Sequence, residues 1–317
     1  MAQTPTSDAT APTRVAVRVS AKVNLWLSVG PRRSDGFHPL ATVFEAVGLH
    51  DTVTAVARDD DRVTIEVSGA DATLVPCDES NLAVRAAVLL RQRWGRPGDG
   101  VALDIAKSIP VAGGMAGGSA DAAGALLACS VLWDLDTGPD DLADLAAELG
   151  SDVPFCLQGA VALGRGRGER LVPVMARGTH VWVVATSQTG LSTPAVFSRF
   201  DEMTSPGEPE VPTGLMAALA KGRCEEVAAQ LGNDLQAAAL DLRPELGEVL
   251  RTGEEAGASA ALVSGSGPTC AFLVPDEARA RTVAAALGGL EQVRDTRIAR
   301  GPAPGAQLLP GSLTGGN

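Results

Sequence analysis

Positive charge is scarce in this chain of 317 residues: 26 lysines and arginines stand against 38 aspartates and glutamates, and the formal net charge is −12. This balance argues against a broad nucleic-acid or anionic-membrane surface, because both need an excess of positive charge. No apolar run approaches the roughly 20 residues that cross a bilayer, and residues 1–13 lack the apolar stretch of a signal peptide. We therefore expect a cytoplasmic protein that binds neither nucleic acid nor membrane.

Cysteine, histidine and lysine are also rare. The five cysteines lie far apart and form no C-x-x-C pair, so they indicate neither a disulfide framework nor a zinc site. Three histidines are too few for a histidine-rich metal centre. The only lysines are Lys22, Lys107 and Lys221. This chain uses arginine for most of its positive charges. The few lysines therefore indicate positions at which the ammonium group itself is needed.

The rest of the composition, with 45% hydrophobic and 20% charged residues, is that of a globular protein, and the length suits two domains. Strand-like patterns fall at 15–27, 52–57, 62–67, 101–106, 181–185, 261–263 and 270–274. Helical patterns fall at 81–94, 119–133, 139–150, 214–230, 235–257 and 276–287. Because no regular βαβ cadence appears, we predict an α+β fold. We expect domains at 14–170 and 171–300, with disordered tails at 1–13 and 301–317.

A glycine-rich loop follows the predicted strand at 101–106 and opens a predicted helix. It comprises Pro110, Val111, Ala112, Gly113, Gly114, Met115, Ala116, Gly117, Gly118, Ser119 and Ala120. Glycines let backbone N–H groups point inward, and a helix N-terminus capped by Ser119 attracts anions through its free N–H groups and dipole. The loop therefore indicates phosphate binding, with close helix–strand packing as the alternative.

Neither of two familiar phosphate motifs matches this loop. Gly113 and Gly118 have the spacing of a P-loop, but Ser119 occupies the position of its lysine. The dinucleotide fingerprint G-x-G-x-x-G is absent from the loop, and no βαβ unit surrounds it.

Polar side chains on the first predicted strand and its turn form a second candidate site. Lys22 and Asn24 project from one strand face, since side chains alternate with a period of two. Such a pair suits a hydroxyl or phosphate ligand, and an exposed edge face is the alternative. The turn signal Asp35-Gly36 then presents Phe37 and His38, where two rings could clamp a planar ligand. A hairpin end with a packed phenylalanine is the alternative there.

Asp152 follows the predicted helix that stops at Gly150. An aspartate in that position is usually a turn or capping residue. A carboxylate held among apolar neighbours is instead a candidate general base. The residues alone leave both interpretations open.

Taken in order, these segments resemble the GHMP kinases, a superfamily of small-molecule kinases, from about Val19 to about Val274. The motifs are AKVNL at 21–25, RRSDGFH at 32–38, DESNL at 78–82, the glycine loop, GSDVPF at 150–155 and SGSGPTC at 264–270. The arginine-rich turn with Phe37 and His38 points to the branch whose substrate is a cytidine-diphosphate-linked methylerythritol, an isoprenoid precursor.

The resemblance implies two domains with mixed and antiparallel sheets and an active site between them. It implies phosphoryl transfer from ATP, with Mg²⁺, to the 2-hydroxyl of that alcohol. Asp152 would take the hydroxyl proton, and Lys22 would hold and polarise the hydroxyl. The enzyme would be a monomer or a homodimer.

The resemblance also assigns the binding residues. The glycine loop would bind the triphosphate, and Asn81 and Leu82 would touch the adenine. The turn at 264–267 would close the site. The metal ligands stay unassigned, with Ser119 as a candidate. The cytidine end and the substrate chain would be held by Asn24, Phe37, His38, Lys107 and Phe197.

The chain departs from the family pattern at two places. Phe37 stands where the family usually has tyrosine, so ring stacking survives and the phenol hydrogen bond does not. Ala112, Ala116 and Ala120 replace residues that are often glycine or serine. Because a Cβ in the left-handed region costs about 1 kcal/mol, we expect none of the three alanines at positive φ.

Three rival functions are considered. Another GHMP kinase would act on a small alcohol such as homoserine or mevalonate, and the Phe37-His38 turn argues against it. A nicotinamide- or flavin-dependent oxidoreductase would need the dinucleotide fingerprint that the loop lacks. A catalytically inactive binding module would not need both Lys22 and Asp152.

Overall fold

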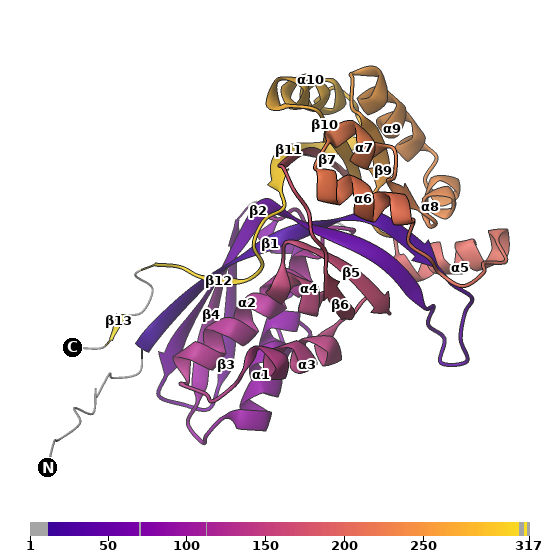
Figure 1. Ribbon diagram of the computed structural model, residues 1–317. Helices are drawn as coiled ribbons and strands as arrows, with labels where there is room; N and C mark the ends of the chain where they lie inside the picture. The colour runs from indigo at the N-terminus through magenta and orange to yellow at the C-terminus, as the bar shows by residue number, and fades with distance from the viewer. Residues whose placement is uncertain (1–11, 70, 112, 311–313, 316–317) are drawn as a thin grey trace, which may run out of the picture.

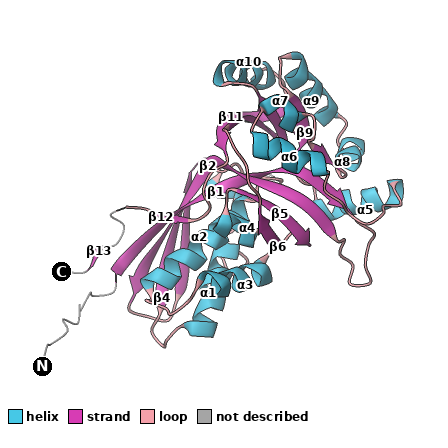
Figure 2. Cartoon of the chain, in the orientation of Figure 1, coloured by secondary structure: helices cyan, strands magenta, loops and turns pink. Residues whose placement is uncertain are grey.

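The computed structural model describes residues 12–69, 71–111, 113–310 and 314–315. Two sheets organise the chain (Figures 1 and 2). The first has nine strands, with β12, β1, β2, β4 and β3 in that order and β5, β6, β8 and β13 off this path. Its strands are β1 (Pro12–Val29), β2 (Leu40–Arg58), β3 (Val63–Gly69), β4 (Gly100–Lys107), β5 (Val161–Gly166), β6 (Arg170–Pro173), β8 (Gly232–Asn233), β12 (Gln307–Leu308) and β13 (Thr314–Gly315). The second sheet is antiparallel in the order β11, β7, β10, β9, with bounds Val293–Gly301, His180–Ser187, Cys270–Val274 and Ala260–Val263.

The hairpin of β1 and β2 is the longest element of the fold. β2 pairs with β4 over residues 52–58 and with β5 over residues 40–45, so one strand serves two parts of the sheet. The register of β1 against β2 shifts after Ser20 and again after Asn24. Bulges of this kind bend a strand and re-aim its side chains. The residues between the two shifts include Lys22, so the bend lies at the candidate site of Lys22 and Asn24.

Helices cover one face of the first sheet (Figure 2). They are α1 (Leu82–Trp94), α2 (Gly117–Leu132), α3 (Pro139–Leu149) and α4 (Val153–Gln158). α2 is buried on nearly all sides because it is built mostly from alanine, glycine and leucine. Gly124 lets it approach the sheet, since a Cβ there would lie 2.7 Å from Val53. This close packing fixes the glycine loop at the start of α2.

Helices lie on both sides of the second sheet (Figure 1), whose alternate residues Val183 and Val184 belong to different core clusters. They are α5 (Thr193–Met203), α6 (Thr213–Lys221), α7 (Cys224–Ala228), α8 (Gln236–Leu242), α9 (Glu245–Glu255) and α10 (Glu277–Gly288). Two predicted helices are each split. The segment 214–230 divides at Gly222, which has a φ of 74°, and 235–257 divides at Pro244, which cannot continue a helix.

The predicted α+β fold with mixed and antiparallel sheets is confirmed. The prediction of a disordered tail at 301–317 is wrong for residues 301–310, which run back from β11 to pair with β1. The expected tail at 1–13 lies outside the described residues except for 12 and 13, which belong to β1. Because β6 and β12 both join the first sheet, that sheet uses residues on both sides of the predicted division at 170, and the division itself stays a prediction.

Two further observations bear on the expectations above. No helix in the described part of the chain is both long enough and apolar enough to cross a membrane. All five cysteines are free.

Candidate active site

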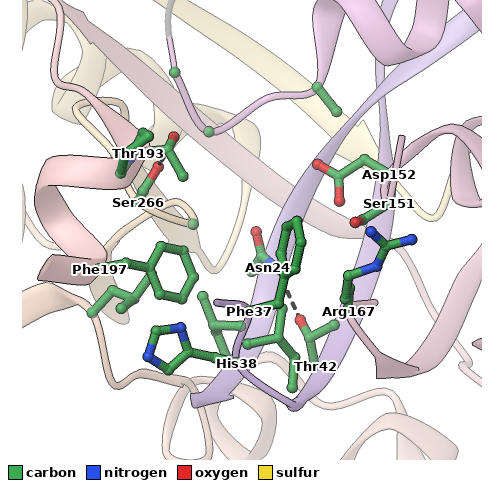
Figure 3. A pocket seen from close by; sticks show the side chains of 18 of the residues that line it. Asn24, Phe37, His38, Thr42, Ser151, Asp152, Arg167, Thr193, Phe197 and Ser266 are labelled. Carbon is green, nitrogen blue, oxygen red and sulfur yellow. Dashed lines mark hydrogen bonds between the residues drawn. The ribbon is translucent and has the colours of Figure 1, made fainter. Parts of the chain in front are cut away.

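A cavity of about 790 Å³ lies where the β1–β2 hairpin, the glycine loop and the second sheet's helices meet (Figure 3). Figure 3 shows Phe197 and His38 on one side, Ser151, Asp152 and Arg167 on the opposite side, and Asn24 and Phe37 between them. Residues far apart in the sequence therefore converge on one space.

Lys22 and Asp152 form the only acid–base pair of the predicted site, and the structure brings them together. Lys22 Nζ lies 3.6 Å from Asp152 Oδ2. The Lys22 side chain is 5% exposed, whereas that of Asp152 is 32% exposed and lines the cavity. Asp152 begins α4, so its position follows from where that short helix is held. A buried ammonium beside an accessible carboxylate can hold a hydroxyl group and accept its proton.

A chain of hydrogen bonds orients the Lys22 ammonium. Lys22 Nζ donates to Asn24 Oδ1 at 2.7 Å, as expected for side chains on one strand face. Asn24 Nδ2 donates to Thr42 Oγ1 at 2.9 Å, and Thr42 donates to the Trp26 carbonyl at 2.7 Å. Lys22 Nζ also lies 5.6 Å from the centre of the Phe44 ring. These contacts leave Lys22 few rotamers other than the one that faces Asp152.

The glycines of the loop serve two different purposes. A Cβ on Gly113 would lie 2.1 Å from the Gly267 carbonyl oxygen, and one on Gly114 would lie 2.2 Å from the Ser264 carbonyl oxygen. These two glycines therefore permit close contact with the turn at 264–267, where Ser264 Oγ donates to the Gly114 carbonyl at 2.8 Å. A Cβ on Gly118 would meet only Leu82, at 3.8 Å. Gly118 thus leaves open space at the cavity.

Helix α2 presents its N-terminus to this open space. Gly117, Gly118 and Ser119 are its first three residues and all line the cavity. Their N–H groups precede the first intrahelical bond, which Ala120 donates to Ala116. N–H groups at such a position bind anions together with the helix dipole. The geometry fits phosphate oxygens.

Two details of the loop differ from the sequence prediction. The cap of α2 is Ala116 and not Ser119, so Ser119 lies inside the first turn. Ala116 has a φ of 58°, in the left-handed region that we expected it to avoid. Packing outweighs the cost of about 1 kcal/mol, because Ala116 contacts the main hydrophobic core. Ala120 is helical as expected, and Ala112 lies outside the described residues.

The far end of the cavity carries aromatic rings. The His38 and Phe197 rings stack with their centres 5.0 Å apart, and His38 Nε2 lies 2.7 Å from Asp201 Oδ1. Phe37 is 51% exposed, and the Arg167 guanidinium lies 5.1 Å from the centre of its ring. An exposed aromatic face at a cavity mouth suits stacking on a planar ligand ring. The structure therefore groups three predicted residues, Phe37, His38 and Phe197.

Lys107 is not part of this cavity, which corrects its predicted place at the substrate. It is buried, with Nζ 2.5 Å from Asp51 Oδ2 and 2.7 Å from Asp121 Oδ2. Asp51 also accepts the N–H groups of Ser108 and Ile109. Lys107 thus pairs with two buried carboxylates beneath the glycine loop. It lines a smaller cavity of about 500 Å³ with Asp71, Pro110 and Arg294 among others.

The protonation of this buried cluster follows from its contacts. Burial raises the pKa of Asp121 to about 7, against the opposing effect of Lys107. Burial alone would lower the pKa of Lys107, but the carboxylates of Asp121 and Asp51 raise it. Asp121 Oδ1 has no hydrogen-bond partner among the described residues, whereas both Asp51 oxygens are bonded. Asp121 is therefore the member that takes up a proton.

Asn81 and Leu82, both predicted at the adenine, have different places in the structure. Asn81 is buried, and its side chain caps α1 by accepting the Ala83 N–H and donates to the Pro76 carbonyl. Asn81 does not line the cavity, whereas Leu82 lines it next to Gly118. Pro110 and Val111 also lie away from this cavity, while Met115 is fully buried. Behind the loop, the Val111 N–H and the Arg294 guanidinium both donate to Asp71 Oδ2.

Several cavity residues were missed by the sequence reasoning. Arg167 lies in a Gly-Arg run that reads only as a tight turn, and Thr42 is hidden within a strand. Asp201 and Thr193 lie on α5, a helix that was not predicted from the sequence and in which only Phe197 was named. Thr193 and Ser266 bond through their hydroxyl groups at 2.7 Å and join α5 to the glycine turn. Of these residues, only Arg167 could have been identified from the sequence, because it is a charged residue between two glycines.

The cavity offers oxygen ligands but no preformed metal cage. The described residues contain no group of three or more His, Cys, Asp or Glu side chains that could hold a metal ion. Mg²⁺ accompanying a nucleotide needs only one or two protein oxygens, since phosphates and waters supply the rest. Ser119 and Asp152 both line the cavity near the N-terminus of α2. These donors fit a nucleotide-borne Mg²⁺.

Comparisons with known proteins agree with this geometry. Residues 81–160 match the family model for the GHMP kinases N terminal domain, and residues 215–290 match that for the GHMP kinases C terminal. A protein named 4-diphosphocytidyl-2-C-methyl-D-erythritol kinase from Cutibacterium acnes is 63% identical, over 94% of this chain and 98% of its own length. The protein of the same name from Streptomyces avermitilis is 55% identical, over 93% and 99%.

Solved structures give the same grouping. A crystal structure of 4-(cytidine 5'-diphospho)-2C-methyl-D-erythritol kinase is 35% identical, with a TM-score of 0.74 over 90% of this chain and 98% of that one. A homoserine kinase from Cytophaga hutchinsonii has a TM-score of 0.72 over 98% of this chain and all of its own, at 17% identity. The second likeness shows a shared fold alone.

Proposed function

The chain belongs to the family of 4-diphosphocytidyl-2-C-methyl-D-erythritol kinases within the GHMP kinases, and we propose how its cavity carries out the reaction of that family. The enzyme transfers a phosphoryl group from ATP to the 2-hydroxyl of its cytidine-diphosphate-linked alcohol, a step in isoprenoid precursor biosynthesis. The observation that carries the mechanism is the Lys22–Asp152 pair, 3.6 Å apart, beside the N-terminus of α2.

Asp152 and Lys22 act on the acceptor hydroxyl. The Lys22 ammonium donates a hydrogen bond to the hydroxyl oxygen and stabilises negative charge as it develops there. Asp152 accepts the hydroxyl proton while that oxygen bonds to the γ-phosphorus and the bond from phosphorus to the ADP oxygen breaks. Such transfer depends on positioning and charge neutralisation more than on a strong base. An ordinary carboxylate, oriented beside an ammonium, is sufficient for this task.

The N-terminus of α2 binds the triphosphate. The N–H groups of Gly117, Gly118 and Ser119 face the cavity and stabilise the phosphoryl oxygens, whose charge rises in the transition state. Mg²⁺ would be held by the phosphates with the Ser119 hydroxyl and the Asp152 carboxylate as nearby protein oxygens, and it would neutralise phosphate charge. Leu82 supplies an apolar contact at the same end of the cavity.

The opposite end binds the cytidine diphosphate. Phe37 is exposed and offers a face for the cytosine, and the stacked His38 and Phe197 rings form the other wall. Arg167 lines the cavity beside Phe37, and its guanidinium forms no salt bridge within 4 Å among the described residues, although its charge helps to lower the pKa of Asp35. A diphosphate needs such an uncommitted cation. We therefore add Arg167 to the substrate-binding residues.

The test is ADP release from ATP and Mg²⁺ with three acceptor alcohols. The proposed function predicts release that depends on 4-diphosphocytidyl-2-C-methyl-D-erythritol, and competition by CMP, because the cytidine end is bound at Phe37 and His38. Homoserine and mevalonate should stimulate no release, since neither carries a nucleotide for that end of the cavity. Release with either small alcohol at comparable kcat/KM would overturn the assignment of the substrate end.

A further inference from the structure

The segment 302–306, hereafter the C-terminal strap, passes directly behind the proposed catalytic pair. It leaves β11 and runs to β12, which pairs with β1 through Gln307 and Leu308 (Figure 1). Its Pro, Ala and Gly residues read in sequence as a disordered tail. Ala303 and Gly305 are nevertheless buried. Its contacts reach both elements that carry the catalytic pair.

The strap first holds the helix that begins at Asp152. Helix α4 has six residues, too few to be stable alone. Its last carbonyl groups have no partner within the helix. The Ala306 N–H supplies one, since it donates to Cys156 at 2.9 Å and to Leu157 at 3.2 Å. The strap is packed tightly there, because a Cβ on Gly305 would lie 2.2 Å from the Leu157 carbonyl oxygen.

The strap also holds the strand pair that carries Lys22. The Ala303 N–H donates to the carbonyl of Ala46, the residue opposite Lys22 in the β1–β2 register. Ser20, two residues before Lys22, donates from Oγ to the Pro304 carbonyl at 2.6 Å. His50 Nδ1 lies 3.1 Å from the same Oγ. Because the Ser20 hydroxyl hydrogen is donated to Pro304, this second bond requires the hydrogen on His50 Nδ1. Burial lowers the pKa of His50. Both bonds lie at the bulge in β1.

Two further hydrogen bonds join the end of α4 to the β1–β2 pair. The Ala160 N–H donates to the Ala303 carbonyl at 2.8 Å, and the Ala46 N–H donates to the Ala160 carbonyl at the same distance. Ala160 follows α4 directly, so the strap, the end of α4 and the strand opposite Lys22 form one network of backbone hydrogen bonds. The strap's hydrogen bonds in the described part of the chain run to neighbours of Lys22 and Asp152 and not to these two residues themselves.

We propose that the C-terminal strap is a positioning element that fixes the distance between Lys22 and Asp152, and that Gly305 within the strap and Ser20, which bonds to it from β1, are the positioning residues. The inference rests on the proposed catalytic roles of Lys22 and Asp152. Misplacement of reacting groups by about 1 Å costs on the order of 100-fold in rate. Loosening the strap therefore lowers kcat, whereas the N-terminus of α2, to which none of the strap's backbone hydrogen bonds runs, keeps its affinity for ATP.

The experiment compares Gly305→Ala and Ser20→Ala with Gly207→Ala, a control at an exposed loop glycine with no atom near its Cβ position. Gly305→Ala pushes the strap away from α4, because the added Cβ would collide with the Leu157 carbonyl. Ser20→Ala removes the hydrogen bond to the Pro304 carbonyl without adding volume. The expected result is a fall in kcat of about 10- to 100-fold for Gly305→Ala and a smaller fall for Ser20→Ala. The KM for ATP should change less than about two-fold, and the control should match the wild type.

Hydrogen exchange at the Ala160 amide gives a readout independent of activity, because its N–H bonds to Ala303 in the strap. Exchange should accelerate in both strap variants. Faster exchange with wild-type kcat would overturn the proposal. Equal changes in kcat and in the KM for ATP would also overturn it, because the strap would then affect the ATP site as much as the catalytic pair. The kcat values are calculated per folded enzyme, since unfolded enzyme lowers the apparent kcat without changing KM. Should Gly305→Ala fail to fold, Ser20→Ala decides. An active Asp152→Asn enzyme would instead overturn the proposed mechanism on which the inference rests.

Discussion

Lys22 Nζ lies 3.6 Å from Asp152 Oδ2, although the first residue is on a strand of the N-terminal hairpin and the second begins a short helix. The pair has unequal exposure, with Lys22 buried and Asp152 open to the cavity. This asymmetry suits a division of labour in which the ammonium is fixed and the carboxylate meets the substrate. We propose that the phosphoryl group is transferred in the space between them and the N-terminus of α2.

The first prediction concerns the base. Asp152→Asn should lower kcat at least 100-fold, because the amide cannot accept the hydroxyl proton, while the KM for ATP stays within a few-fold of the wild type. Steady-state ADP release measures both values. Asp136→Asn, an exposed aspartate outside the cavity, is the matched control and should behave as the wild type. Near-normal turnover of the Asp152 variant would contradict its assignment as base.

The second prediction concerns the charge at the substrate end. Arg167→Ala should raise the KM for the cytidine substrate about 10-fold, since a charge-assisted contact contributes about 1.5–3 kcal/mol. The KM for ATP should be unchanged. Arg165→Ala is the matched control, because Arg165 occupies the same Gly-Arg run but is exposed and does not line the cavity. Equal effects of the two variants would mean that Arg167 contributes only to overall charge.

The third prediction separates the two kinds of glycine in the loop. Gly113→Ala places a Cβ 2.1 Å from the Gly267 carbonyl and should destabilise the fold by about 1–3 kcal/mol. Gly118→Ala adds the same methyl where only Leu82 lies within 4 Å, so the melting temperature should hold. It should instead raise the KM for ATP several-fold by crowding the phosphates. An unchanged KM in the Gly118 variant would place the triphosphate elsewhere.

The fourth prediction concerns the buried cluster beneath the loop. The raised pKa of Asp121, about 7, means that the folded state keeps a proton between about pH 4 and pH 7 that the unfolded chain has lost. This group therefore makes the free energy of unfolding fall as pH rises through that range, and adds no further change above it. Asp121→Asn removes the ionisation and hence this dependence.

Urea unfolding of the wild type and Asp121→Asn at pH 5 and pH 8 tests this sign. The free energy of unfolding of the variant, relative to the wild type, should be larger at pH 8 than at pH 5. Asp136→Asn should show no such trend. A difference that is the same at both pH values would indicate that Asp121 is ionised throughout and that Lys107 fully offsets its burial.

Much of the site was readable from local sequence. Side-chain alternation placed Lys22 beside Asn24, and the glycine density before a helix indicated the anion site at Gly117 and Gly118. The Phe37-His38 pair after the turn was identified by its resemblance to a family motif. These features depend on residues close in sequence, whose relative positions the local backbone determines.

Features that depend on distant residues were not readable. The family resemblance assigned Lys107 to the substrate, and nothing near it in the sequence shows that its side chain pairs with Asp51 and Asp121. Ala116 adopts positive φ because packing in the core outweighs a local preference. The strap at 302–306 has a composition typical of disorder, yet its order comes from backbone hydrogen bonds to α4 and the β1–β2 pair. Composition carries no information on such bonds, since every residue except proline offers the same N–H.

The most direct test of the central claim is ³¹P NMR of the product formed from ATP, Mg²⁺ and 4-diphosphocytidyl-2-C-methyl-D-erythritol. Phosphorylation of the hydroxyl at the Lys22–Asp152 pair predicts a new phosphomonoester resonance while both diphosphate resonances of the substrate remain. The phosphomonoester should be absent with Asp152→Asn. Loss of the diphosphate resonances, or consumption of ATP without a phosphomonoester on the alcohol, would contradict the account.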